Sequence, residues 1–203
     1  MITVRELGPT AYADALHRMR RHVAQRVADR DAAGDELWLT EHPAVYTLGF
    51  ASRPGHLRNP GTIPVIETER GGQVTYHGPG QVIAYTLLDL RRRKLGVRDL
   101  VCRLEEGIIR CLAGYGIVGE RRPGAPGIYV RPHPYGGAPA TDVTSPMAAA
   151  NPTAPANPPL SQAPAGAKIA SIGLKVSRGL TWHGVAVNGR MDLAPFSHID
   201  PCG

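Results

Sequence analysis

Residues 70–81 read RGGQVTYHGPGQ, and the rest of the chain is organised around them. They lie between two apolar segments, Ile63–Thr68 and Val82–Leu88, which are both predicted as core strands. Gly-Pro-Gly alone could be only a tight turn. An Arg-Gly-Gly six residues earlier, followed by Tyr76 and His77, exceeds what a turn needs. Glycine lets backbone approach a ligand closely, so we predict a ligand-binding loop anchored between two strands.

The composition of the 203 residues fits one globular domain with a sizeable core, because 42% of them are hydrophobic. No apolar run is long enough to span a bilayer, and the N-terminus lacks the pattern of a secretory signal. The three cysteines, Cys102, Cys111 and Cys202, contain no C-x-x-C pair. We therefore expect a cytoplasmic protein with free thiols, no membrane association and no zinc site.

The chain is basic, with a formal charge of +6 and a pI near 9.5. The arginines could have no special meaning, or they could attract a nucleic acid or an acidic protein. Aromatic residues are only 5% of the chain and do not alternate with basic ones. We therefore expect no nucleic-acid partner. A monomer is the default expectation.

The predicted elements mix helices and strands without a regular βαβ alternation, which favours an α+β fold with an antiparallel or mixed sheet. Helices are predicted over Tyr12–Arg30 and Val97–Tyr115, with Cys111 among the buried residues of the second. Besides the two strands named above, strands are predicted over Glu36–Thr40, Ala44–Leu48, Lys168–Gly173 and Trp182–Asn188, and loops over Gly49–Gly61 and Phe196–Gly203.

Residues 131–166 differ from the rest of the chain. They are rich in proline and alanine and carry few charges or large apolar side chains. Such a segment cannot offset the entropy of ordering, so we predict a flexible insertion that loops out of a single domain. A proline-rich partner-binding segment is the alternative.

Lys168 and Cys202 are the candidates for chemistry. In a regular strand Lys168 shares an apolar face with Ala170 and Ile172, so its amine needs a partner or a lowered pKa, unless it reaches water along its own stem. Cys202 follows Pro201 in a loop, where it could be a nucleophile or an incidental residue near the end. A nearby ammonium would favour the thiolate, so the two residues make sense together.

His77 and His183 are candidate polar ligands or proton carriers, although either could be a structural histidine. The histidines are too dispersed for a metal site, so no metal is expected. Residues 70–81 match neither a phosphate loop ending in Gly-Lys-Ser/Thr nor G-x-G-x-x-G. No motif therefore supports a nucleotide site.

Three motifs together resemble the lipoyl(octanoyl) transferase family, also called the LipB family. They are residues 70–81, Lys168-Ile169-Ala170-Ser171-Ile172-Gly173 and Pro201-Cys202-Gly203, supported by residues 42–49 and 183–188. Their order and spacing agree along almost the whole chain. The resemblance implies an α/β fold related to the catalytic domains of lipoate and biotin protein ligases.

The resemblance also implies a two-step octanoyl transfer without ATP or any other cofactor. Octanoyl-acyl carrier protein would acylate Cys202, and the acyl group would then pass to a lysine of a lipoate-dependent protein. Acceptors would be the lipoyl domains of dehydrogenase E2 subunits and the glycine-cleavage H protein. Lys168 would lower the pKa of Cys202. The matching substrate-binding residues are Arg70, Gly71, Gly72, Gln73, Val74, Thr75, Tyr76, His77, Ser171, Ile172, Gly173, Gly184, Val185 and Ala186.

The chain departs from the family at its end. Family members continue well past Pro-Cys-Gly, whereas this sequence stops at Gly203, so we expect a truncated C-terminus. Two alternative functions remain. An ATP-dependent lipoate- or biotin-type ligase would not need Cys202, and a catalytically impaired protein would only bind acyl groups or their carrier.

Overall fold

The computed structural model describes residues 1–130 and 166–200 of the chain. The strands in these residues form two β-sheets. The predicted insertion falls outside the described residues except for Gly166, and Cys202 also falls outside them. The elements follow in the order β1 (Ile2–Pro9), α1 (Tyr12–Ala28), β2 (Asp35–Glu41), β3 (Val45–Leu48), β4 (Val65–Glu67), β5 (Val74–His77), β6 (Gln81–Leu87), α2 (Val97–Ala113), β7 (Gly119–Arg122), β8 (Ala125–Val130), β9 (Lys168–Ser177), β10 (Leu180–Asn188) and the 3₁₀ helix η3 (Ala194–His198).

The larger sheet has seven strands in the order β1-β2-β6-β10-β9-β8-β7. Strand β1 runs parallel to β2, and the other neighbouring pairs are antiparallel. The smaller sheet has the order β4-β3-β5, with one parallel and one antiparallel pair. The predicted α+β class with a mixed sheet is confirmed.

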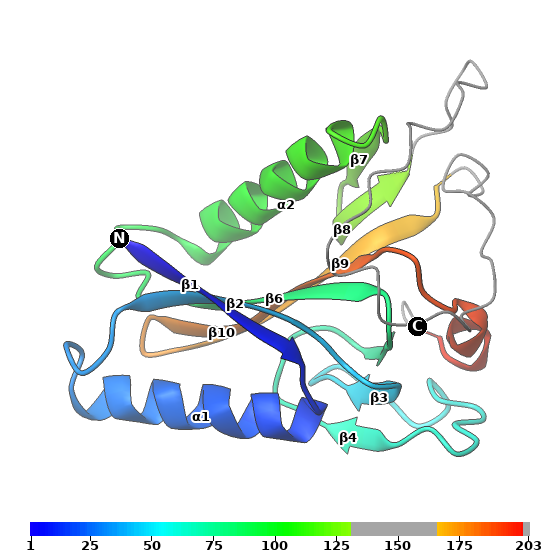
Figure 1. Ribbon diagram of the computed structural model, residues 1–203, viewed down its shortest axis with the longest axis horizontal. Coiled ribbons are helices and arrows are strands. Elements are labelled where there is room, and N and C mark those ends of the chain that lie inside the picture. The colour runs from blue at the N-terminus through cyan, green and yellow to red at the C-terminus, as the bar shows by residue number, and fades with distance from the viewer. Residues whose placement is uncertain (131–165, 201–203) are drawn as a thin grey trace.

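The two α-helices cover opposite faces of the larger sheet (Figure 1). Helix α1 packs Leu16, Met19 and Val23 against side chains of β2, β6 and β10. Helix α2 packs Ile108 and Leu112 against β8, β9 and β10. Both sets recur at helical spacing, and each helix buries apolar side chains of the central strands on its own face of the sheet. None of the described helices is long and apolar enough to span a membrane.

Helix α2 corrects one expectation about the cysteines. Cys111 is exposed, as is Cys102, so the prediction of a core Cys111 is wrong. The helix buries Leu100, Ile108 and Leu112. Cys111 precedes Leu112 by one residue and therefore points about 100° away from that face.

Strands β1, β7 and β8 were not predicted. Strands β1 and β7 form the two edges of the larger sheet, and their exposed polar residues give no clear alternation. Strand β8 ends at Val130, whose N–H donates to the carbonyl oxygen of Ala167 at 2.9 Å, and the N–H of Gly166 donates back to the Val130 carbonyl at 3.1 Å. The chain therefore leaves and re-enters the described fold at one place.

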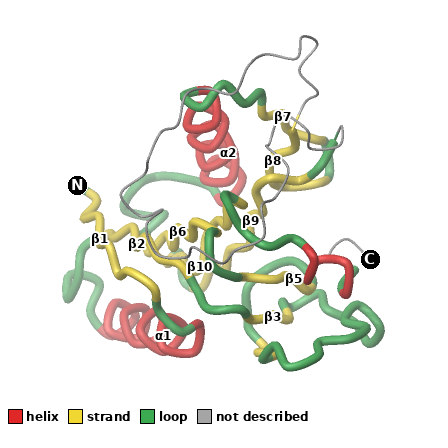
Figure 2. Tube along the Cα trace, turned by 45° about the vertical axis from the view of Figure 1, so that its right-hand side comes forward, coloured by secondary structure: helices red, strands yellow, loops and turns green. Residues whose placement is uncertain are grey.

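The smaller sheet lies beside the larger one, and the loop between β3 and β4 extends along the side of the molecule where η3 lies (Figure 2). This arrangement places residues 70–81, which contain β5, between the larger sheet and the last described residues of the chain.

Candidate active site

Residues 70–81 combine an irregular segment, a strand and a turn. Val74–His77 form β5, so the prediction of one continuous loop is wrong in its middle. Residues 78–80 form a turn in which Gly80 has φ +85°. A Cβ atom on Gly80 would lie 1.8 Å from the Arg190 carbonyl oxygen, so only glycine fits there. The Gly-Pro-Gly part is thus the tight turn considered as an alternative, and the ligand-binding candidates lie before it.

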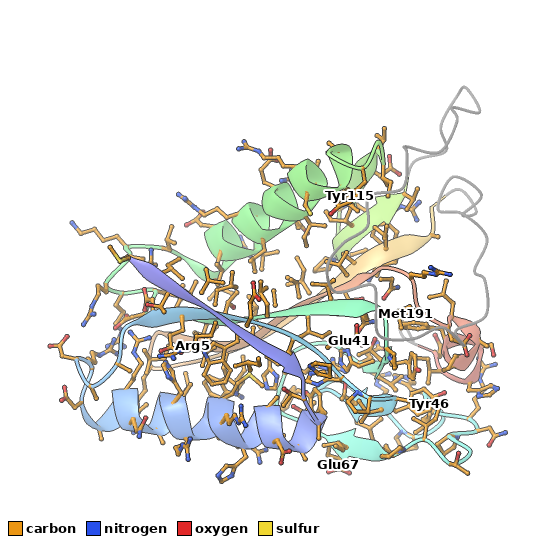
Figure 3. The ribbon with its side chains drawn as sticks, in the orientation of Figure 1. Arg5, Glu41, Tyr46, Glu67, Tyr115 and Met191 are labelled. Atoms are coloured by element: carbon orange, nitrogen blue, oxygen red, sulfur yellow. The ribbon has the colours of Figure 1, made fainter. Side chains whose placement is uncertain are left out.

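Strand β5 turns two of its side chains into a small apolar core. Val74 and Tyr76 are buried there with Tyr46, Met191 and Ile199. Figure 3 shows Tyr46 and Met191 on this side of the molecule, near η3. The side chains of Val74 and Tyr76 therefore serve packing, and that packing holds the chain leading to Cys202 against the motif.

Three of the segments expected to line the acyl site lie against one another. The N–H of Gly71 donates to the Leu174 carbonyl oxygen at 2.9 Å, which fastens the Arg-Gly-Gly segment to β9. A Cβ atom on Gly173 would lie 3.0 Å from the Gly71 carbonyl oxygen, so glycine permits this close approach. In the antiparallel pair of β9 and β10, the directly opposed residues are Gly173 and Gly184, Ile172 and Val185, and Ser171 and Ala186.

Arg70 is a buried cation whose partners are all neutral. Its Nε and Nη2 atoms donate to Thr47 Oγ1 at 3.2 and 2.9 Å, and Nη2 also donates to the Thr47 carbonyl oxygen at 2.7 Å. No carboxylate among the described residues forms an ion pair with it. Burial lowers its pKa. A buried, uncompensated positive charge favours an anion or a developing oxyanion beside it.

His77 is held as a neutral base. Burial lowers its pKa to about 3, and the charge of Arg70 acts in the same direction. The Gln81 amide nitrogen donates to the Tyr76 carbonyl, which leaves Gln81 Oε1 to accept from His77 Nδ1 at 2.7 Å. His77 Nε2 is therefore the acceptor atom, 3.3 Å from Thr47 Oγ1.

His183 has a backbone conformation that strands rarely contain. Its φ is +61°, although it lies inside β10. The hydroxyl of Thr86 donates to its carbonyl oxygen at 3.2 Å, and the hydroxyl of Thr181 donates to the Thr86 carbonyl at 2.6 Å. The imidazole is buried, burial lowers its pKa to about 3, and Nδ1 has no partner among the described residues. Such local strain is typical of functional sites.

Three further members of this buried polar group, His42, Tyr12 and Tyr85, were not predicted as site residues from the sequence. His42 Nδ1 donates to the Thr10 carbonyl at 2.6 Å, and His42 Nε2 accepts from the Tyr85 hydroxyl at 2.6 Å. The Tyr12 ring stacks on His77 with 5.6 Å between centroids. Burial raises the pKa of Tyr85 and lowers that of His42. In the sequence, Tyr12 and Tyr85 look like ordinary core residues, so only the fold reveals them.

Lys168 begins β9, half-buried, with its Nζ atom 5.2 Å from the Tyr129 ring centroid. The register between β8 and β9 shifts by one residue here, which is a β-bulge. Ile169 and Ala170 are adjacent, yet both pack into the core under α2. The expectation that Lys168, Ala170 and Ile172 share one face is therefore wrong, because the bulge interrupts the alternation.

Residues 49–61, within the loop between β3 and β4, contact both the Arg-Gly-Gly segment and the end of the described chain. At one end the N–H of Phe50 donates to the Arg70 carbonyl oxygen at 2.9 Å. At the other, the N–H of Asp200 donates to the His56 carbonyl at 2.7 Å. Asp200 is the last described residue, two positions before Cys202. The loop therefore joins the Arg-Gly-Gly segment to the chain that leads into Cys202.

Among the described residues, neither a metal site nor a well-formed cavity coincides with this region. The described residues contain no group of three His, Cys, Asp or Glu side chains that could hold a metal ion. A cavity of about 430 Å³ lies elsewhere, lined by Met1, Gly34, Asp35, Arg92, Arg93, Leu95 and Arg103. It contains none of the predicted site residues.

Comparisons with known proteins agree with this fold. The family model of the lipoyl protein ligase A/B catalytic domain matches residues 11–201. An octanoyltransferase of Polaromonas naphthalenivorans is 48% identical over 202 residues, covering 100% of this chain and 84% of that protein. An octanoyltransferase of Paraburkholderia phytofirmans is 47% identical over 203 residues, covering 100% of this chain and 73% of that protein.

Solved structures show the same fold at low sequence identity. LipL1 of P. falciparum in complex with lipoate superposes with a TM-score of 0.62 and 10% identity, over 98% of this chain and 51% of that one. A bipartite lipoate protein ligase from Thermoplasma acidophilum superposes with a TM-score of 0.57 and 13% identity, over 98% of this chain and 66% of that one.

The fold and the site thus define the class: the chain belongs to the lipoyl protein ligase A/B catalytic domain family. Within that family its curated relatives are octanoyltransferases, which confirms the resemblance seen in the sequence. Its activity is accordingly that of an acyltransferase that moves octanoyl groups in protein lipoylation.

Proposed function

We propose that the octanoyl transfer passes through a thioester on Cys202, with octanoyl-acyl carrier protein as donor. The Cys202 thiolate attacks the thioester carbonyl, and the carrier leaves as its thiol after taking up a proton. A lysine amine of the acceptor then attacks the acyl-enzyme, loses a proton and releases the thiolate. Each step exchanges one activated acyl bond for another or for an amide, so no ATP is consumed.

One observation carries this proposal: the Arg-Gly-Gly segment is fastened to β9 by the Gly71 to Leu174 hydrogen bond, with Arg70 buried beside it. A cation without a carboxylate partner suits the negative charge that develops on the thioester oxygen. Glycine-rich backbone suits the close approach of that group.

Lys168 and His77 have distinct proposed roles. Lys168 favours the Cys202 thiolate and carries protons, since an ammonium lowers the pKa of a nearby thiol. His77, neutral at physiological pH, orients Thr47 and through it Arg70. Apart from Val74 and Tyr76, whose side chains pack in the apolar core, the other substrate-binding residues inferred from the resemblance keep their proposed place along the acyl chain. Burial of an eight-carbon chain contributes about 0.8 kcal/mol of binding free energy per CH₂ group. This is enough for the site to distinguish acyl chains of different length.

We further propose that the acceptors are lipoyl domains of dehydrogenase E2 subunits and the glycine-cleavage H protein, in the cytoplasm, with the enzyme acting as a monomer. The lipoate ligase fold of the neighbouring structures supports a lipoyl-domain acceptor.

The test compares Cys202 with the two exposed cysteines, Cys102 and Cys111, which serve as controls. The protein is incubated with octanoyl-acyl carrier protein without ATP, and its intact mass is measured. We expect one octanoyl adduct, retained in Cys102→Ser and Cys111→Ser, whose thiols are exposed, and lost in Cys202→Ser. An adduct that persists in Cys202→Ser contradicts the thioester. Acceptor modification that requires ATP indicates the ligase instead, and reversible binding alone indicates an impaired binding protein.

A further inference from the structure

Phe50 is an apolar residue in an unusual place. Phe50 is 85% exposed, although its backbone is hydrogen-bonded to that of the buried Arg70. The backbone is fixed, because the N–H groups of Phe50 and Ala51 donate to the Arg70 and Gly72 carbonyls at 2.9 and 3.0 Å. An exposed aromatic side chain on a fixed backbone is a ready anchor for a protein partner.

The charges of the same loop have one sign. Residues 49–61 contain Arg53 and Arg58 but no aspartate or glutamate. Both arginines are exposed and have no ion pair with any described residue. Lys175 of β9 adds a third cation, with its Nζ atom 6.0 Å from the Phe50 ring centroid.

Some of the chain's other basic residues are paired with carboxylates within the protein. Arg30 pairs with Asp89, and Arg93 pairs with Asp35, at the end of the sheet that holds the 430 Å³ cavity. The charges of these two arginines are offset by those carboxylates. The positive charge of residues 49–61 is not, so it attracts an acidic surface from outside.

The loop also has the right position for delivery of a substrate. It contacts the Arg-Gly-Gly segment at Phe50, and it pairs with the end of the described chain, where the Arg58 N–H donates to the His198 carbonyl at 2.9 Å. A protein bound to the loop would therefore lie beside both the Arg-Gly-Gly segment and the chain that leads to Cys202.

We propose that residues 49–61 together with Lys175 form the docking surface for an acidic carrier protein that presents the acyl thioester on a flexible arm. Phe50 is the apolar anchor, and Arg53, Arg58 and Lys175 supply the charge complementarity that steers the encounter. This inference rests on the proposed function, because it names the surface that receives the donor of that reaction.

The experiment compares two donors of the same acyl group, octanoyl-acyl carrier protein and the small thioester octanoyl-N-acetylcysteamine. The rate of enzyme acylation is followed by quenched-flow mass spectrometry. For Phe50→Ala and for the double variant Arg53→Glu/Arg58→Glu, we expect kcat/KM to fall about tenfold or more with the carrier donor and to change less than about twofold with the small donor. The salt dependence of the carrier reaction should weaken in the double variant.

The matched control is Arg18→Glu/Arg21→Glu, which makes the same charge change at exposed positions of α1. It should react like the wild type with both donors. Equal losses with both donors would show that the loop shapes the acyl site instead of docking a carrier. An unchanged acylation rate, or a defect confined to transfer to the lipoyl domain, would also overturn the proposal. If neither donor acylates the wild-type protein, the proposed function itself fails.

Discussion

Gly173 and Gly71 approach each other so closely that a Cβ atom on Gly173 would lie 3.0 Å from the Gly71 carbonyl oxygen and 3.3 Å from Arg70 Cδ. One residue later, Leu174 accepts the hydrogen bond from the Gly71 N–H. The position of Arg70 therefore depends on a strand about one hundred residues away in the sequence, and it depends on the absence of a side chain there.

Gly173→Ala should impair activity more than stability. The added methyl group pushes the Arg-Gly-Gly segment away from β9 by a few tenths of an ångström, so we expect kcat/KM to fall about tenfold or more, since catalysis is sensitive to small displacements. The melting temperature should change little. Gly184→Ala is the contrasting variant, because its Cβ would lie 2.0 Å from the Ala84 carbonyl oxygen and should destabilise the sheet itself. Equal effects of the two variants on melting temperature would contradict this account.

Arg70→Met should separate stability from function. Methionine fills a similar volume without burying a charge, and replacing buried charges by apolar residues is often neutral or stabilising. We therefore expect a melting temperature equal to or above that of the wild type, with acyl-enzyme formation slowed by about 100-fold. Thermal unfolding and single-turnover acylation measure the two quantities. A folded variant that is acylated at the wild-type rate would show that Arg70 does not stabilise the oxyanion.

Acidification should destabilise the protein through His77 and His183. The pKa of each falls from 6.5 in the unfolded chain to about 3 in the folded state, so only the unfolded chain takes up these protons between those values. The stability that the neutral imidazoles contribute is complete above pH 6.5 and is lost as the pH falls towards 3. At pH 5 the loss is up to about 2 kcal/mol for each histidine.

Urea unfolding at pH 7.5 and 5.0 checks this prediction. His77→Gln should lose less stability between the two pH values than the wild type does, whereas the exposed His17→Gln should lose as much. The same pH dependence in both variants would show that His77 does not carry the effect.

The segment between Val130 and Gly166 should be replaceable. Because the N–H of Val130 pairs with Ala167 and the N–H of Gly166 pairs with Val130, a two-residue turn can connect the strands directly. We expect a variant with residues 131–165 replaced by Asn-Gly to fold and to retain activity within about twofold, since loop length costs little stability. A folded but inactive variant would contradict the prediction that this segment loops out of the domain.

Most helices and strands with a recognisable apolar pattern could be predicted from the sequence. The apolar spacing of Leu16, Met19 and Val23 marks α1, and residues 168–173 and 182–188, which were predicted as strands, lie in β9 and β10. The Gly-rich motif predicted a segment that the fold places against β9.

Features that depend on tertiary contacts could not be predicted. The positive φ of His183 has no local signal, since hydroxyls from β6 and β10 satisfy the interrupted pairing. The bulge beside Lys168 exists only because β8 pairs with β9. His42 belongs to the buried polar group because the hydroxyl of Tyr85, on a distant strand, donates to its ring nitrogen. In each case the partner that determines the geometry lies far away in the sequence.

The most direct test of the central claim is a single turnover of isolated acyl-enzyme. The protein is acylated with octanoyl-acyl carrier protein, freed of donor by gel filtration, and mixed with a lipoyl domain in the absence of ATP. We expect the octanoyl group to leave Cys202 and to appear on the lipoyl-domain lysine in a one-to-one amount, as two opposite mass changes. An acyl-enzyme that is stable to the lipoyl domain, or a lipoyl domain modified only when ATP is added, would contradict it.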